Sequence, residues 1–187
     1  FTTLGGSASV VAGGDVLDSV GQGILALTTD GNSTVTLNAG KTVSASLNGV
    51  FAQTATGLSN VDAGAGSTIR STGGDGINAT ATGAGGTVIV NAFGAIDTTP
   101  GGLNGITAAT NNGEVKVNTG AGAIQSGQSG VVATAGGGQN VTVVGGTGAI
   151  TASGADGLLA VTAGRVVDVS TLGPVTGKTG IETSSGA

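Results

Sequence analysis

Five residue types are missing from this sequence of 187 residues: Cys, His, Met, Trp and Tyr. Without Cys no disulfide framework can form, and without Cys and His the usual ligand sets of zinc sites are excluded. Trp and Tyr platforms for sugar rings are also absent, and Phe1, Phe51 and Phe93 are dispersed along the chain. The composition therefore predicts no cofactor and no His or Cys metal centre.

Charge is also scarce, since only 8% of the residues are charged and the net charge is −5. Binding to nucleic acid needs clustered basic residues that neutralise phosphates. The five basic residues are instead scattered singly, at Lys41, Arg70, Lys116, Arg165 and Lys178. There is no run of 18 apolar residues, the length needed for a transmembrane helix. We therefore expect neither a nucleic-acid partner nor membrane insertion by this segment.

Gly is abundant, at 40 residues, and it marks a repeat rather than disorder. A glycine is followed by an aliphatic residue and then, two positions later, by Ala, at intervals of 23 to 29 residues. The copies are Gly23-Ile24-Leu25-Ala26, Gly49-Val50-Phe51-Ala52, Gly76-Ile77-Asn78-Ala79, Gly105-Ile106-Thr107-Ala108, Gly130-Val131-Val132-Ala133, Gly157-Leu158-Leu159-Ala160 and, with Thr in place of Ala, Gly180-Ile181-Glu182-Thr183. A period of 20 to 50 residues indicates a solenoid.

Two further strand patterns lie between successive copies. The second strand is predicted at Val35-Thr36-Leu37, Val61-Asp62-Ala63, Val88-Ile89-Val90, Val115-Lys116-Val117, Val141-Thr142-Val143 and Val167-Asp168-Val169. The third is predicted at Val43-Ser44-Ala45, Ile69-Arg70-Ser71, Ile96-Asp97-Thr98, Ile124-Gln125-Ser126, Ile150-Thr151-Ala152 and Val175-Thr176-Gly177. Alternation with a period of two places the aliphatic residues inside and the middle residue of each triplet outside.

These patterns predict an all-β fold, a right-handed parallel β-helix with three strands per coil and about seven coils of about 26 residues. One domain covers residues 1–187. The first coil is the least regular, with Phe1 to Leu4, Ser9-Val10-Val11 and Gly14-Asp15-Val16 as its strands. Because the chain starts and stops within the repeat, we expect a segment of a longer or stacked solenoid. Asn38, Asn91 and Asn118 follow the second strand and predict a partial Asn ladder or, alternatively, ordinary turn residues.

The three-strand coil, the coil length and the dominance of Gly, Ala, Val, Thr and Asn resemble the passenger domains of bacterial autotransporters and related large surface adhesins. The resemblance covers nearly the whole chain and rests on the style of the repeat. It implies a right-handed parallel β-helix, export across the outer membrane and a role at the bacterial cell surface.

Parallel β-helices also include polysaccharide-cleaving enzymes, which need converging carboxylates. Asp75 and Asp156 precede the repeat glycine in their coils, but three coils, or roughly 14 Å, separate them. Asp15 and Asp18 are close in sequence and have no third partner. We interpret these acids as solvated turn residues. The chain is therefore predicted not to be an enzyme, and a polysaccharide-acting β-helix is kept as a minor alternative.

One outward stripe predicts a contact surface. The position after the first-strand aliphatic residue, and the position two further on, are apolar in coils near both ends of the chain. The candidate contact residues are Leu25, Leu27, Phe51, Val132, Leu159 and Val161. Exposed apolar faces often mark interaction sites. The alternative is that the parity is inverted, or that a neighbouring loop covers the stripe.

The leading hypothesis is a non-catalytic structural or adhesive β-helix, secreted to the outside of a bacterial cell. The alternative is a subunit or segment of an extracellular filament built by stacking solenoids. Expected partners are further coils of the same chain, other copies packed end to end or side by side, or a host or matrix surface receptor. Open solenoid ends favour self-association because they leave strand edges unpaired.

Overall fold

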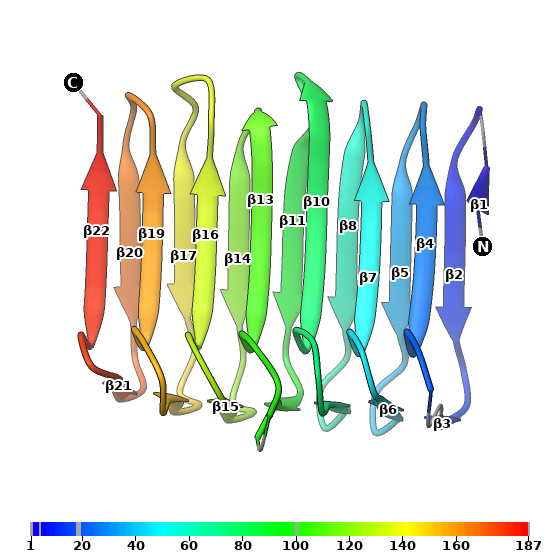
Figure 1. Ribbon diagram of the computed structural model, residues 1–187, viewed down its shortest axis with the longest axis horizontal. Coiled ribbons are helices and arrows are strands. Elements are labelled where there is room, and N and C mark those ends of the chain that lie inside the picture. Colours follow the sequence, from blue (N-terminus) through cyan, green and yellow to red (C-terminus); the bar gives the residue numbers. More distant parts are fainter. Residues whose placement is uncertain (1, 4, 18–19, 100, 187) are drawn as a thin grey trace.

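The structure is a computed structural model that describes residues 2–3, 5–17, 20–99 and 101–186. Strands and turns make up all of this part of the chain (Figure 1). The same residues contain no helix that could cross a bilayer. The strands form three parallel sheets, here named A, B and C, and each coil of the chain contributes one strand to each sheet.

Sheet A contains the strands that begin at the repeat glycines. Its strands, in spatial order, are β1 (Thr2–Thr3), β4 (Ile24–Thr28), β7 (Val50–Thr54), β10 (Ile77–Ala84), β13 (Ile106–Asn112), β16 (Val131–Ala135), β19 (Leu158–Thr162) and β22 (Ile181–Ser185). Sheet B contains β2 (Ala8–Ala12), β5 (Ser33–Leu37), β8 (Leu58–Ala63), β11 (Thr87–Ala92), β14 (Val115–Thr119), β17 (Val141–Gly145) and β20 (Val167–Thr171).

Sheet C is made of the shortest strands. They are β3 (Val16–Leu17), β6 (Thr42–Ala45), β9 (Thr68–Ser71), β12 (Ala95–Asp97), β15 (Ile124–Ser126), β18 (Ile150–Ala152) and β21 (Val175–Thr176). In Figure 1 the chain rises through sheet A in front, descends through sheet B behind and returns along the bottom through sheet C. Seen from the N-terminal end it turns clockwise as it recedes, which is a right-handed coil. The predicted parallel β-helix of about seven coils is confirmed.

The core is a set of columns in which like residues stack from coil to coil. Each first-strand aliphatic residue is the register partner of the next, from Ile24 through Val50 and Ile77 to Ile181. The third-strand column from Val16 to Val175 is equally regular. Burial alternates along the strands, and the predicted inward residues are buried except in the terminal coils. The predicted parity is therefore correct.

The predicted coil alignment in sheet B is wrong by two residues at one junction, between β8 and β11, where the structure pairs Val61 with Val90 rather than with Val88. The other predicted alignments are confirmed, since Val35 pairs with Val61, and Val88, Val115, Val141 and Val167 pair in succession. Val88 instead pairs with Ser59, which in turn pairs with Ser33. Both serines face the core, where their hydroxyls donate to the carbonyls of Ala26 and Ala52 at 2.8 and 2.9 Å. A buried hydroxyl is tolerated when it has a hydrogen-bond partner. Ser33 and Ser59 can therefore occupy core positions at which the apolar pattern predicts an aliphatic residue.

Close packing explains the glycine that opens each copy of the repeat. A Cβ atom built on Gly76 would lie 2.3 Å from Cγ2 of Ile96 in sheet C and 2.7 Å from the carbonyl oxygen of Gly105. Gly105 and Gly130 meet the equivalent atoms at similar distances. The corner from sheet C to sheet A therefore passes directly over the core, where only glycine fits.

Threonines close the core at the corner from sheet A to sheet B. Thr28, Thr54 and Thr110 point inward and donate their hydroxyls to carbonyls of the preceding coil, those of Gly6, Gly31 and Gly86, at 2.7–2.8 Å. This corner column satisfies loop carbonyls that would otherwise be buried without a partner.

Replacing Ile106 by Asp should unfold or severely destabilise the protein, by about 4 kcal/mol or more, because the charge has no partner in the core. Ile106 is 0% exposed. The matched variant, Thr142→Asp, places the same charge on the outer face of sheet B and should cost about 1 kcal/mol or less. Urea unfolding of both variants, followed by circular dichroism, measures the difference. Equal losses would contradict the inward and outward assignment.

Candidate functional site

Sheet A carries two parallel columns of outward side chains, and both contain the predicted contact residues. Leu25 is the register partner of Phe51, and Leu27 of Gln53. Farther along, Val132 is the partner of Leu159 and Thr134 of Val161. The six predicted residues are half-buried on the outer face, so the parity that places them there is correct.

The structure separates these six residues into two apolar clusters. Leu25, Leu27 and Phe51 form the N-terminal cluster, and Val132, Leu159 and Val161 form the C-terminal cluster. Asn78 and Thr107 interrupt the column between them. Phe51 and Val132 are three coils apart, which is roughly 14 Å along the axis. Sheet A thus presents two spaced apolar clusters on one flat surface.

A column of polar side chains at the corner before sheet A was not predicted. The Asn48 side-chain oxygen accepts from the backbone N–H of Asp75 at 2.8 Å. Asp75 Oδ1 accepts from the N–H of Asn104 at 3.0 Å, and Asn104 Oδ1 accepts from that of Ser129 at 3.1 Å. Each side chain therefore holds the backbone of the next coil. The signal in the sequence is a polar residue directly before the repeat glycine in every coil.

This column corrects the interpretation of Asp75 as a solvated turn residue. Its side chain is only 5% exposed, and its second carboxylate oxygen accepts from Nδ2 of Asn78 at 2.8 Å. Asp156 occupies the equivalent corner three coils later, as predicted, and is half-buried. Asp75 is therefore a structural carboxylate that joins neighbouring coils through Asn104 and also accepts from Asn78.

Removing the Asp75 side chain should destabilise the fold, whereas neutralising its charge should leave the stability nearly unchanged. Asp75→Ala leaves the N–H of Asn104 without its partner and should lower the free energy of unfolding by about 1–3 kcal/mol. Asp75→Asn keeps an acceptor for Asn104, and a half-turn of the Asn78 amide, whose Nδ2 now donates to Asp75, lets the new amide donate to Asn78 Oδ1, which is buried and has no hydrogen-bond partner in the parent structure. This variant should stay within about 1 kcal/mol of the parent protein. Chemical denaturation of both variants measures the difference, and equal losses would refute this structural role.

A second polar ladder runs along the outer face of sheet B. Asn118 donates to Asn91 Oδ1 at 2.8 Å, and Asn91 donates to Asp62 Oδ1 at 2.6 Å. Asn60 donates to the other oxygen of Asp62, also at 2.6 Å. The predicted pairing of Asn91 with Asn118 is confirmed. Asn38 is not part of the ladder, because Asp62 pairs with Thr36 and Asn38 lies beyond the end of β5.

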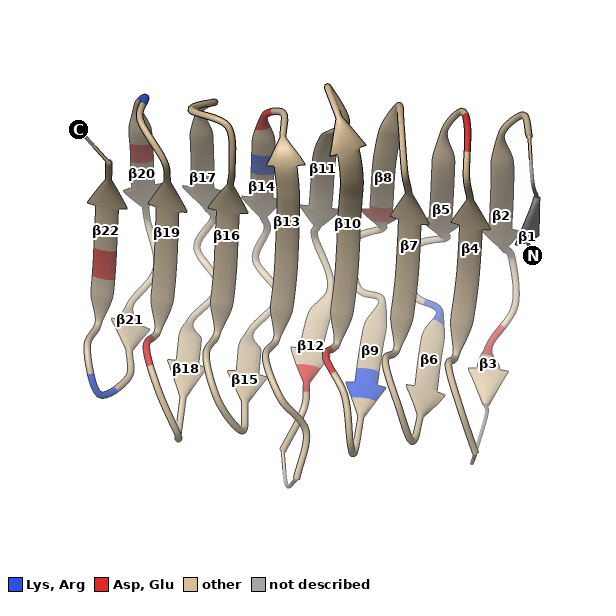
Figure 2. Cartoon of the chain, turned by 45° about the horizontal axis from the view of Figure 1, so that its top comes forward, with Lys and Arg blue, Asp and Glu red and all other residues tan. Residues whose placement is uncertain are grey.

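The remaining charges are dispersed over the corners and outer faces (Figure 2). Asp15 accepts the N–H of Thr42 at 2.9 Å, and Asp97 accepts from both the N–H and the hydroxyl of Thr99. Within the described ranges, no group of three or more acidic residues gathers where it could hold a metal ion. Asp18, the predicted neighbour of Asp15, lies outside the described residues. Asp15 and Asp97 thus accept hydrogen bonds from nearby donors, and the described carboxylates do not gather at one site.

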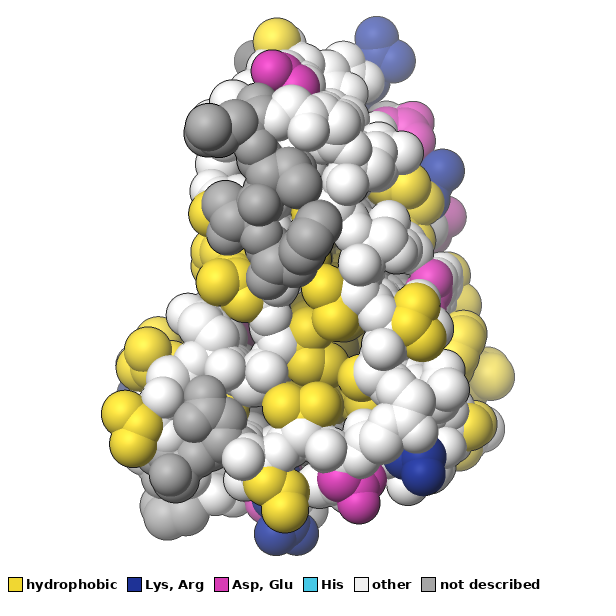
Figure 3. Space-filling view, turned by 90° about the vertical axis from the view of Figure 1, so that its right-hand side faces the viewer, with side chains coloured by type: hydrophobic (Ala, Val, Ile, Leu, Met, Phe, Trp, Pro, Cys, Tyr) yellow, Lys and Arg dark blue, Asp and Glu magenta, His cyan; other side chains and the backbone are white. Residues whose placement is uncertain are grey.

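Both ends of the coil stack expose residues that are core in the central coils. At the C-terminal end Ile181 is 44% exposed, and Val167, Val169 and Val175 are only partly buried. At the N-terminal end Val10 and Val16 are half-buried, and Figure 3 shows hydrophobic side chains in the middle of this end face. The end coils of the described structure thus carry apolar surface beside unpaired strand edges.

Comparison with known proteins identifies no relative. No family model matches the sequence, and neither a curated protein nor a solved structure matches it significantly.

Proposed function

We propose that this protein is a non-catalytic structural or adhesive β-solenoid that acts on the outside of a bacterial cell. The observation that carries the proposal is the pair of apolar clusters on the outer face of sheet A. They stand on a surface whose backbone is fixed by hydrogen bonds to both neighbouring coils. A flat, rigid surface of this kind loses little conformational entropy when it binds.

The spacing of the two clusters favours contact with a surface over contact with a small ligand. Small ligands prefer concave sites that enclose most of their area. The two clusters lie on an open sheet and are separated by polar residues, so a partner must extend across several coils to touch both. The resemblance of the repeat to surface adhesins supports an extracellular location for such a partner, a host or matrix receptor.

The test is adhesion of beads coated with the protein to cultured epithelial cells and to surfaces of extracellular-matrix protein. The variant Phe51→Asn, Leu159→Asn removes one anchor from each cluster and should reduce adhesion at least about tenfold, as loss of interface anchors does. Gln53→Asn, on the same face, is the matched control and should adhere like the parent protein. Melting temperatures equal to that of the parent protein show that both variants are folded.

If the parent protein adheres to none of these surfaces, the adhesive role is wrong. If the double variant adheres as well as the control, adhesion exists but does not use sheet A. Neither result depends on whether the protein associates with itself.

A second candidate function, a filament subunit, is favoured by the exposed ends. In a head-to-tail stack, the last coil of one copy would face the first coil of the next, and the half-buried Val169 and Val10, which belong to the same core column, would both be covered at the joint. Such a contact is heterologous and can propagate without closing. Covering these residues would stabilise the joint by about 25 cal/mol for each Å² of apolar area removed from water.

Light scattering and negative-stain electron microscopy test the stacking. The parent protein should form rods whose length increases with concentration, and Val169→Asp should abolish them because a charge would enter the joint. Thr151→Asp, on an exposed outer position of sheet C, is the control and should leave rod formation unchanged. A parent protein that remains monomeric at every concentration would refute the filament function.

A further inference from the structure

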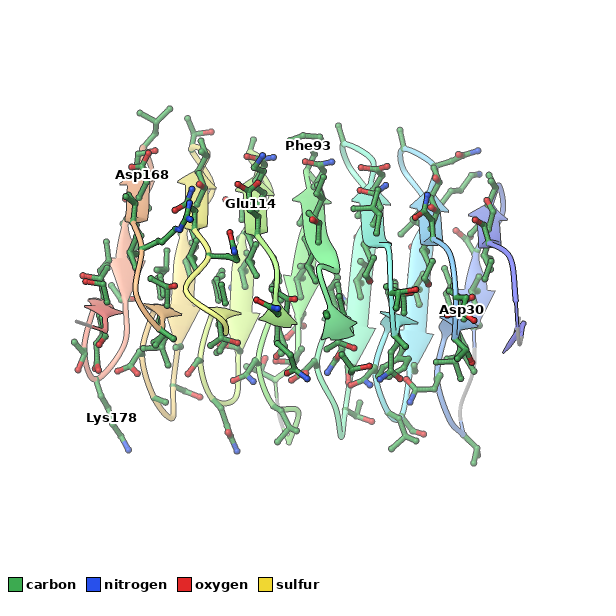
Figure 4. All side chains as sticks on the ribbon, turned by 90° about the horizontal axis from the view of Figure 1, so that it is seen from above. Asp30, Phe93, Glu114, Asp168 and Lys178 are labelled. Carbon is green, nitrogen blue, oxygen red and sulfur yellow. The ribbon has the colours of Figure 1, made fainter. Side chains whose placement is uncertain are left out.

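A groove crosses the corner between sheets B and C, away from the two clusters of sheet A. It has a volume of about 350 Å³ and spans three coils. Its lining consists of Thr36, Leu37, Asn38, Ala39, Asp62, Ala63, Gly64 and Phe93. Figure 4 shows Phe93 on the side of the molecule that also carries Glu114 and Asp168, opposite Lys178.

The groove exists because Gly64, in the middle of the three coils, has no side chain to fill it. Backbone hydrogen bonds align Gly64 between Asn38 and Phe93, since Gly64 N–H donates to the Leu37 carbonyl and Phe93 N–H to the Ala63 carbonyl, both at 2.9 Å. A Cβ on Gly64 would lie 2.7 Å from the backbone nitrogen of Ala39, so no larger residue fits the floor. Phe93 therefore stands as an isolated aromatic wall that is 45% exposed.

The ring is supported from the opposite side by a second glycine. A Cβ on Gly120, in the next coil, would lie 3.0 Å from Cδ1 of Phe93, so the ring rests against the Gly120 backbone. The wall is thus a fixed aromatic surface. Its neighbours on both sides have no side chains that could cover it.

The polar group of the groove is a carboxylate held in one orientation. Asp62 accepts one amide hydrogen bond on each oxygen, from Asn91 and from Asn60, both at 2.6 Å. These amides are neutral, and the ion pair found among the described residues joins Glu114 to Lys116 instead. Among the described residues Asp62 thus has no basic partner, and each of its oxygens retains a lone pair beyond its single hydrogen bond.

We propose that this groove binds an arginine side chain of a partner protein. The planar guanidinium donates two parallel hydrogen bonds to the two oxygens of Asp62, a geometry that a carboxylate fixed by Asn60 and Asn91 presents in advance. Its aliphatic stem lies along the exposed Ala39 and the bare backbone of Gly64, and Phe93 contributes cation–π attraction. The net charge of −5 also favours the approach of a basic partner.

The chemistry of the groove favours a guanidinium over two other ligands. A lysine ammonium is a compact point charge that does not match two fixed oxygens at once. A sugar ring would stack on Phe93, but its neutral hydroxyls would leave the charge of Asp62 without compensation. Charge and planarity together therefore select arginine.

The sequence offers a direct assay because it contains no Trp or Tyr. Phe93→Trp introduces a single fluorophore that keeps an aromatic wall and strengthens cation–π attraction. Nα-acetyl-arginine amide should change the emission of this variant in a saturable manner, and raising the salt concentration should weaken binding severalfold. Phe51→Trp, which places the fluorophore on sheet A, is the control for nonspecific quenching and should not respond.

The carboxylate is tested in the same background. Adding Asp62→Asn to Phe93→Trp removes the charge and keeps the shape, and it should weaken binding of the arginine probe at least about tenfold. Asp168→Asn is the matched control, because Asp168 is an exposed acid of sheet B four coils away, and it should leave the affinity unchanged.

Three results would overturn the proposal. They are a Phe93→Trp protein that does not respond to the arginine probe, equal affinities with and without the Asp62 charge, and a response to methyl glucoside but not to the arginine probe. Adhesion through sheet A and stacking of the ends use other residues. Failure of this site is therefore distinguishable from failure of the proposed function.

Discussion

The hydrogen bonds between successive coils impose the constraint on which the rest of this structure depends. They fix neighbouring strands about 4.8 Å apart and force each residue to lie directly over its counterpart in the coil below. A side chain that enters the core must therefore pack against one of nearly the same shape. This is why Ile, Val and Ala recur at fixed places while the outer residues vary, and why a glycine occupies the corner above each third-strand aliphatic residue.

The same constraint explains how much of the fold could be predicted from the sequence. Sheets A and C have an unbroken aliphatic column, from Ile24 to Ile181 and from Val16 to Val175, and their register was correctly predicted. Sheet B has serine at Ser33 and Ser59, where later coils have valine. A pattern of apolar residues cannot show that a hydroxyl faces inward when its partner is the carbonyl of Ala26, which is seven positions away and in another sheet.

The polar ladders were less predictable because their energy depends on the register between coils. Asp75 is one acid among ten in the sequence, and only the structure shows its oxygen over the N–H of Asn104, 29 residues later. Asp62 replaces the expected Asn38 in the ladder of sheet B for the same reason. A difference of two residues in alignment decides which side chains meet. The contact residues of sheet A were predictable in position because they follow the regular first strand, whereas the groove combines residues from three coils.

In such a fold, only residues that do not hold the coils together can be selected for function. The inward columns are fixed by packing, and the corner column of Asn48, Asp75 and Asn104 is fixed by backbone hydrogen bonds. The outer columns are free to vary, and there an isolated departure from the repeat is informative. Phe93 is such a departure, because glycines precede and follow it in its column and leave its ring uncovered. Part of the ring rests against the Gly120 backbone, and the 45% that stays exposed is the surface that the proposed contact with a partner would cover.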